Sequence, residues 1–222
     1  MHQVTSLCPE AAPERVIARL HAALHRPLPG RAAQQAMAPS PRALQPEPGI
    51  TPRPAAVLAP FYVGPGGLSL LFTLRPQTLT HHAGQVSFPG GRQDPGDENH
   101  AATALRETEE ELGISAQCVE VLGRLTPLYI PPSQTQVYPI VGWIPRLPAL
   151  RPNAQEVAKV LEVPASRLLA PETRATCHWD YAGTQQSAPC YRVYDLSIWG
   201  ATAMIVSELL TILAPLVPAA GE

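Results

Sequence analysis

Residues 88–114 read FPGGRQDPGDENHAATALRETEEELGI, and this stretch decides how the chain folds and where its site lies. Its second half places Glu107, Glu110 and Glu111 at spacings i, i+3 and i+4. At about 3.6 residues per turn, the three carboxylates project from one helix face within roughly 100° of arc. The leucines of the same helix fall on nearly the opposite face, where they can pack into a core. This pattern predicts a site for a hard divalent cation such as Mg²⁺ or Mn²⁺.

The alternative interpretation of this stretch is a solvated acidic helix. Like charges four residues apart cost about 0.2–0.5 kcal/mol per pair, and a face shaped for solubility would intersperse Lys or Arg. Only Arg106 lies within reach, four residues before Glu110. The preceding Gly90 and Gly91 let the backbone approach a ligand closely, because glycine has no Cβ and tolerates positive φ. A metal site therefore explains more of the stretch than a solvated face does.

The same residues resemble the Nudix box, whose family pattern is GX5EX7REUXEEXGU with U aliphatic. The tail of the motif follows this pattern except that Thr108 stands at an aliphatic position. The front of the motif departs by one residue. Asp97 is the sixth residue after Gly91, whereas Glu98 stands the required distance before Arg106. The simplest account is a one-residue insertion between Gly91 and Glu98, which leaves either Asp97 or Glu98 at the structural acid position.

Upstream, residues 71–76 and 84–91 are similar to the signature of the coenzyme A diphosphatase subfamily, LLTXRSX3RX3GX3FPGG. The positions that match in register are Thr73, Arg75, Gly84, Phe88, Pro89, Gly90 and Gly91. Pro76 and Thr80 replace the Ser and the second Arg of that signature. Shorter stretches of similarity to the subfamily begin at Glu156, Leu161 and Ile198.

This resemblance implies an α/β fold, a Nudix-type α/β/α sandwich around a mixed β-sheet with a catalytic loop-helix-loop. Residues 54–217 would form the Nudix hydrolase domain, and residues 1–53 would supply an N-terminal helix and a Pro-rich lead-in. Hydrophobic spacing adds a helix over 11–26, and apolar runs add paired strands over 55–63 and 68–74.

The helix that carries the carboxylates is expected from about His100 to Leu112. Asp97 or Asn99 is the candidate N-cap, and Gly113 is the C-terminal glycine. The remaining expected elements are strands at 119–129, 136–144, 174–181 and 191–196 and helices at 166–169 and 199–213.

The resemblance implies a hydrolase that depends on a divalent metal and cleaves the diphosphate linkage of coenzyme A. The products would be 3′,5′-ADP and 4′-phosphopantetheine. The alternative is a Nudix hydrolase of another nucleoside diphosphate derivative, such as ADP-ribose or a dinucleotide, which the replacements at Pro76 and Thr80 favour. A third hypothesis is a ligand-sensing protein whose Nudix fold no longer catalyses. The complete set of box carboxylates with Arg106 argues against that hypothesis.

Within the predicted site, Glu107 and Glu111 are expected to be the principal ligands of Mg²⁺ or Mn²⁺, with Glu110 shared between ions. Arg106 is expected to orient Glu107 or a neighbouring carboxylate through its guanidinium group. The alternative for Arg106 is an ordinary i,i+4 ion pair with Glu110.

The general base that activates the attacking water is expected to be Glu107 or a later acid. Glu156 is the best later candidate, because the resemblance places an acid of its loop near the metals. The alternative for Glu156 is a surface salt bridge with Arg151 or Lys159.

Arg75, Gly90 and Gly91 are the expected substrate-binding residues. Arginine stays charged and binds phosphate through two parallel hydrogen bonds, which suits the 3′-phosphate or the diphosphate of coenzyme A. The alternative for Arg75 is a surface arginine at the end of a strand.

Composition limits the partners of the chain. A net charge of −2 over 222 residues gives no footprint for nucleic acid or for an anionic membrane, so neither is an expected partner. The small-molecule substrate is what the resemblance implies. No apolar run is long enough for a transmembrane helix, and the N-terminus lacks the apolar segment of a secretory signal. Nothing in the sequence specifies an oligomeric state.

The cysteines bear on the compartment. Cys8, Cys118, Cys177 and Cys190 lack metal-binding spacing and are interpreted as thiols of a reducing compartment, so a cytoplasmic location is expected. Cys177 and Cys190 could also face each other across two strands.

Overall fold

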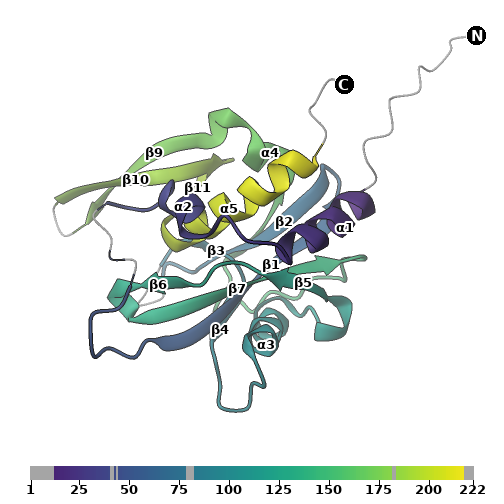
Figure 1. Cartoon of the computed structure of the whole chain (residues 1–222), viewed down its shortest axis with the longest axis horizontal. Coiled ribbons are helices and arrows are strands. Elements are labelled where there is room, and N and C mark those ends of the chain that lie inside the picture. Colours follow the sequence, from purple (N-terminus) through teal and green to yellow (C-terminus); the bar gives the residue numbers. More distant parts are fainter. Residues whose placement is uncertain (1–12, 41–42, 44, 79–82, 182–183, 218–222) are drawn as a thin grey trace, which may run out of the picture.

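The computed structural model describes residues 13–40, 43, 45–78, 83–181 and 184–217 (Figure 1). The α-helices are α1 (Pro13–Leu24), α2 (Gly30–Gln35), α3 (His100–Leu112), α4 (Ala165–Leu169) and α5 (Gly200–Leu213). The strands of the larger sheet are β1 (Arg53–Gly64), β2 (Gly67–Leu74), β3 (Val86–Ser87), β4 (Gly90–Arg92), β5 (Glu120–Arg124), β6 (Leu128–Ile130), β7 (Thr135–Ile144) and β8 (Lys159–Pro164). The strands of the smaller sheet are β9 (Arg174–Tyr181), β10 (Thr184–Val193) and β11 (Leu196–Trp199). Short 3₁₀ turns are η1 (Ala116–Cys118), η2 (Pro131–Ser133), η3 (Pro171–Thr173) and η4 (Ala214–Leu216).

The larger sheet is mixed. Its path runs β3-β2-β1-β7-β5, while β4 pairs with β1, β6 with β7 and β8 with β2. The β1–β2 hairpin expected from the apolar runs is confirmed, and Gly64 lies opposite Gly67 at its turn. β1 and β7 are parallel, from Arg53 opposite Thr135 to Tyr62 opposite Ile144. The other pairings in this sheet are antiparallel.

Both faces of this sheet are covered, as the alternation along β1 shows. Ala59 and Phe61 point into a large core shared with α1 and α5. Ala56 and Leu58 point the other way and pack with Ala104 of α3. Figure 1 shows the same layers, with α3 below the sheet and α1, α2 and α5 above it. The expected α/β/α sandwich is therefore confirmed.

The N-terminal helix packs on the face of the sheet opposite to α3. Val16, Ile17, Leu20 and Leu24 are its buried residues, which confirms the amphipathic pattern. They join the core that includes α5 and the inward side of β5. This helix therefore supports the sheet from behind and does not cover the carboxylates of α3.

A buried carboxylate ties α2 and the β5–β6 connection to α5. Glu208 is fully buried, yet hydrogen-bond donors surround it. Its oxygens accept from the backbone N–H of Gly30 at 3.2 Å, from Nε2 of Gln34 at 2.8 Å and from Oγ1 of Thr126 at 2.7 Å. The backbone N–H of Thr126 also donates to it. A buried carboxylate is tolerated only with such partners.

The smaller sheet corrects the interpretation of the cysteines. Cys177 on β9 and Cys190 on β10 form a disulfide, so they are not idle thiols. The second strand of this hairpin is β10 (Thr184–Val193), and not residues 191–196 as the sequence predicted, because those residues cross the turn between β10 and β11. The hairpin brings the cysteines together, because Cys177 lies opposite Ala188, two residues from Cys190. Cys118 is free and half-buried, and Cys8 lies outside the described residues. In the described part of the chain, every helix is too short or too polar to cross a bilayer.

Candidate active site

The helix that carries the carboxylates is fixed at both ends by local signals. The side chain of Asn99 accepts hydrogen bonds from the backbone N–H groups of Ala101 and Ala102, at 2.9 and 3.0 Å. Gly113 ends the helix in the left-handed conformation, at φ 70°, and its N–H donates to the carbonyl of Glu109. Asn99 is therefore the N-cap, and the predicted bounds of α3 are confirmed.

The departure at Thr108 is accommodated by a hydrogen bond. Thr108 is fully buried, at a position where the Nudix pattern has an aliphatic residue. Its hydroxyl donates to the carbonyl of Ala104 at 2.6 Å, so no polar group is left unsatisfied. The methyl group of threonine remains free to pack like that of a valine.

Two consecutive glycines bring β4 against both the sheet and α3. Gly90 has φ +152°, and a Cβ there would collide with the carbonyl of Ala56 on β1. A Cβ on Gly91 would collide with the carboxyl group of Glu107. The sequence interpretation expected close approach to a ligand, and the structure shows close approach to protein groups of the site.

Arg106 organises the loop before α3. Its Nε and Nη2 donate to the two carboxylate oxygens of Asp97 at 3.0 and 3.1 Å, and Nη2 also donates to the carbonyl of Arg92. Nη2 lies 3.0 Å from Oε1 of Glu107. Nη1 lies 3.2 Å from Oε1 of Glu110. The expected orienting contact and the alternative i,i+4 pair are therefore both present.

Asp97 holds the structural acid position, and its ion pair with Arg106 lowers the pKa of its carboxyl group to about 2. Glu98 is exposed. The spacing from Gly91 to the acid is thus the regular one. The extra residue lies between Asp97 and Arg106, where the chain enters α3, and not between Gly91 and Glu98 as the sequence suggested.

Three carboxylates meet at the C-terminal half of α3. Glu107, Glu111 and Glu156 each place an oxygen within 4.8 Å of the others. Glu110 is not part of this group, because its half-exposed side chain turns toward Arg106. The structure therefore brings together two of the three predicted metal ligands and adds Glu156, which the sequence analysis considered as a base.

Glu111 is the most deeply buried member of this cluster, with 2% of its surface exposed. The pKa of its carboxyl group is raised to about 8, chiefly by burial and also by the neighbouring carboxylates of Glu156 and Glu107. The guanidinium group of Arg75 and the backbone N–H of Gly90 act in the opposite direction. Burial also raises the pKa of Glu107.

The donor set of the cluster fits a divalent cation. Among the described residues, Oε2 of Glu111 is buried and has no hydrogen-bond partner. A buried oxygen without a partner, on a carboxylate that lies beside two further carboxylates, is costly unless a positive charge joins them. Mg²⁺ and Mn²⁺ prefer such oxygen ligands. Glu107, Glu111 and Glu156 are thus the residues that could hold the ion.

Arg75 lies beside this cluster at the neck of the loop that follows β2. Its backbone N–H donates to the carbonyl of Gln85 at 3.0 Å, and its carbonyl accepts from the N–H of Gly84 at 3.1 Å. Its side chain is half-buried, and its Nε has no hydrogen-bond partner in the part of the chain that the structure describes. The backbone of Arg75 is thus held in place, and its guanidinium group lies close enough to Glu111 to lower the pKa of that carboxyl group. Thr80, in the same loop, lies outside the described residues.

The loop that carries Glu156 contains a residue that the sequence analysis did not single out. Asn153 donates from its side-chain amide to Oε1 of Glu156 at 3.4 Å. Its backbone N–H donates to the carbonyl of Glu111 at 2.9 Å. Asn153 stands three residues before Glu156, a spacing typical of a polar residue that caps a turn. This spacing is visible in the sequence and could have indicated the role of Asn153.

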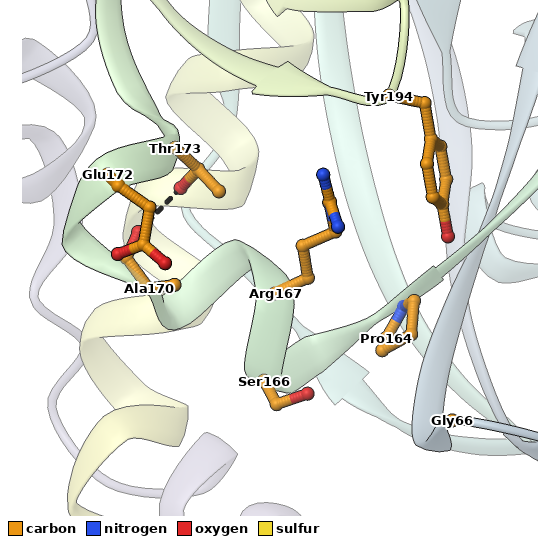
Figure 2. Close-up of a pocket in the computed structure, with 8 residues that line it drawn as sticks. All are labelled: Gly66, Pro164, Ser166, Arg167, Ala170, Glu172, Thr173 and Tyr194. Atoms are coloured by element: carbon orange, nitrogen blue, oxygen red, sulfur yellow. Dashed lines mark hydrogen bonds between the residues drawn. The ribbon is translucent and has the colours of Figure 1, made fainter.

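A cavity of about 460 Å³ lies elsewhere on the molecule (Figure 2). It forms between the β1–β2 turn, α4 and the β10–β11 turn, and Arg167 places its guanidinium group 4.8 Å from the ring of Tyr194 there. Gly66 at its rim precedes β2, whereas Arg75 follows the other end of that strand. This cavity shares no residue with the carboxylate cluster.

Comparison with known proteins agrees with this geometry. The family model described as the NUDIX domain matches residues 52–176. The human "Mitochondrial coenzyme A diphosphatase NUDT8" is 41% identical over 167 residues, covering 74% of this chain and 71% of that protein. The "Uncharacterized Nudix hydrolase NudL" of Photorhabdus laumondii is 45% identical over 157 residues, which cover 71% of this chain and 83% of that protein. The crystal structure of the Nudix hydrolase RenU from M. smegmatis shares the fold at 18% identity, with a TM-score of 0.50 over 84% of this chain and 98% of that chain.

The mixed sheet, the loop-helix-loop of α3 and its carboxylate cluster together define an enzyme class, the diphosphatases that act on phosphorus anhydrides. The chain belongs to the Nudix family. The resemblance noted from residues 88–114 is thereby confirmed.

Proposed function

We propose that this chain is a diphosphatase that depends on a divalent metal and cleaves coenzyme A, and its thioesters, to 3′,5′-ADP and 4′-phosphopantetheine. One observation carries the proposal: the guanidinium group of Arg75, whose Nε has no hydrogen-bond partner among the described residues, lies beside three converging carboxylates. A site with both features suits an anion that bridges a metal and an arginine, as a diphosphate does. Human and mouse relatives named coenzyme A diphosphatase, 41% and 39% identical, support the choice of substrate.

In this proposal, Glu107, Glu111 and Glu156 would hold Mg²⁺ or Mn²⁺, while Glu110 pairs with Arg106 outside this group. The bound cation would neutralise charge on the phosphoryl oxygens and lower the pKa of a coordinated water. Arg106 keeps Glu107 in place through their 3.0 Å contact. Gly91 gives the carboxyl group of Glu107 the room that it occupies.

Arg75 binds the diphosphate or the 3′-phosphate of the substrate and aligns the scissile bond with the attacking water. Glu107 or Glu156 takes the proton from that water. Their surroundings differ, because Arg106 pairs with Glu107, whereas Asn153 reaches Glu156 through one long hydrogen bond. The pH dependence of kcat in Glu107→Gln and Glu156→Gln identifies the base, because the correct variant loses the acidic limb of the profile.

Product analysis by mass spectrometry tests the substrate. Protein incubated with coenzyme A and Mg²⁺ or Mn²⁺ should yield 3′,5′-ADP and 4′-phosphopantetheine, and EDTA should abolish both. Arg75→Lys keeps the charge and should still lower kcat/KM, because lysine lacks the planar fork. Intact coenzyme A together with cleaved ADP-ribose or a cleaved dinucleotide would overturn the choice of substrate and favour the alternative that Pro76 suggests.

A further inference from the structure

The segment between β7 and β8, residues 145–158, contains no described helix or strand, yet it is docked at several points. The N–H of Arg151 donates to the carbonyl of Leu112 at 2.8 Å. The N–H of Asn153 donates to the carbonyl of Glu111 at 2.9 Å. These carbonyls belong to the last turn of α3, where a helix leaves acceptors without intrahelical partners. The segment therefore uses the end of the catalytic helix as its anchor.

The far end of the segment is anchored to the sheet. The N–H of Ala158 donates to the carbonyl of Leu74 at 2.8 Å, at the end of β2 next to Arg75. Val157 is buried and packs in a cluster with Leu112 and Ile114. Glu156 thus lies between an anchor on α3 and an anchor on β2, and its backbone has little freedom.

Asn153 builds the turn that connects these anchors. Its carbonyl accepts from the N–H groups of Glu156 and Val157 at 2.9 and 2.8 Å. Its side-chain oxygen accepts from the N–H of Gln155 at 3.1 Å, and its side-chain amide donates to Oε1 of Glu156. Every polar group of Asn153 therefore serves either the turn or the helix that bears Glu107 and Glu111.

We propose that Asn153 is a positioning residue that sets the third carboxylate of the metal site, so that affinity for the cation depends on its side-chain amide. By donating to Oε1 of Glu156, the amide fixes the orientation of the carboxylate relative to Glu107 and Glu111. Hydrogen bonds from residues that do not touch the metal orient its ligands and change the affinity for the ion. This inference rests on the metal site of the proposed function.

The test is a titration of the full chain with Mn²⁺, in which the electron paramagnetic resonance signal of the free ion measures how much Mn²⁺ is bound. Asn153→Ser keeps an oxygen that can accept from the N–H of Gln155 but removes the amide donor. This variant should bind Mn²⁺ about 10-fold more weakly, while thermal unfolding in EDTA changes little. Gln155→Ala is the matched control, because this exposed residue contributes only its backbone N–H and should bind as the parent does.

A double-mutant cycle separates positioning from general damage to the loop. If Asn153 acts through Glu156, Asn153→Ser should cause no further loss of Mn²⁺ affinity in a Glu156→Ala background. Unchanged affinity in the single variant, or an equal further loss in the double variant, would overturn the inference. A parent protein that binds no Mn²⁺ would instead overturn the metal site of the proposed function, so the two failures are distinguishable.

Discussion

At the scale of single residues, the buried carboxyl group of Glu111 links the stability of the metal-free fold to pH. Its pKa is raised from 4.5 to about 8, chiefly by burial. Between these values the folded chain keeps a proton that the unfolded chain has lost. This protonation stabilises the folded chain fully below the ordinary pKa of 4.5, and the stabilisation is lost as the pH rises through the folded-state pKa of about 8.

We expect the free energy of unfolding of EDTA-treated protein to fall by a few kcal/mol between about pH 5 and about pH 9. Glu111→Gln should flatten this dependence, because an amide stays neutral, and should lower kcat about 100-fold or more, because a metal ligand is lost. Urea unfolding at both pH values and turnover with Mg²⁺ measure the two effects. A variant as pH-dependent as the parent would assign the effect to another group.

Gly91 offers a steric test of the site. The carboxyl group of Glu107 occupies the space that a Cβ would need, so Gly91→Ala should displace this carboxylate. We expect kcat to fall about 100-fold, since a displacement of about 1 Å can have that effect. Gly96, in the loop that follows β4, is the matched control, because a Cβ there would meet nothing within 4 Å. Similar kinetics for Gly91→Ala and Gly96→Ala would contradict the steric argument.

At the scale of elements, α3 could be predicted to the residue because its signals are local. Asn99, Gly113 and the acidic face all lie in one short stretch, and none depends on a distant partner. The position of the structural acid could not be settled in this way. Asp97 and Glu98 are adjacent carboxylates, and only the path of the backbone into α3 decides which of them reaches Arg106.

The ion pair between Asp97 and Arg106 predicts a specific contrast in the loop before α3. Asp97→Asn should lower both Tm and kcat, because Arg106 would lose the partner that fixes it toward Glu107. Glu98→Gln, one residue later and exposed, should change neither. The pKa of Asp97 is lowered to about 2, so its contribution is present above the ordinary value of 3.8 and is lost as the pH falls toward 2. Equal effects of the two substitutions, by thermal unfolding and kinetics at neutral pH, would refute the assignment.

Other elements could not be predicted because their causes are not local. β4 is three residues long, too short to show a period, and it exists because two glycines fit against β1 and Glu107. The loop that carries Glu156 docks on α3 through backbone N–H groups, which every non-proline residue has. The sequence alone could therefore place Glu107 and Glu111 on one helix face but could not show that Glu156 completes the cluster.

At the scale of the whole molecule, the two faces of the larger sheet have separate roles: the α3 face carries the candidate active site, and the α1 and α5 face holds the large core. Leu20 of α1 is fully buried on the face opposite to α3. We expect Leu20→Ala to lower the free energy of unfolding by about 2–5 kcal/mol, while kcat/KM of the folded enzyme stays at the parental value. Ala22→Ser, on the exposed side of α1, is the control. Denaturant unfolding and kinetics check both, and a loss of kcat/KM in Leu20→Ala would show that the faces are coupled.

The parallel pairing of β1 with β7 has a consequence for the order in which this protein folds. The two strands are neighbours in the sheet, but the chain between them includes α3 and the loop before it. Bringing the ends of so long a connection together costs chain entropy before the contacts between β1 and β7 can stabilise the pair. This pairing should therefore form late and slowly. The helix packs on β1 and contacts β7, and Glu156 arrives only with the chain beyond β7. Newly made or refolding chains should therefore gain their metal-binding capacity only in the final cooperative step, with no partly folded species that binds the ion.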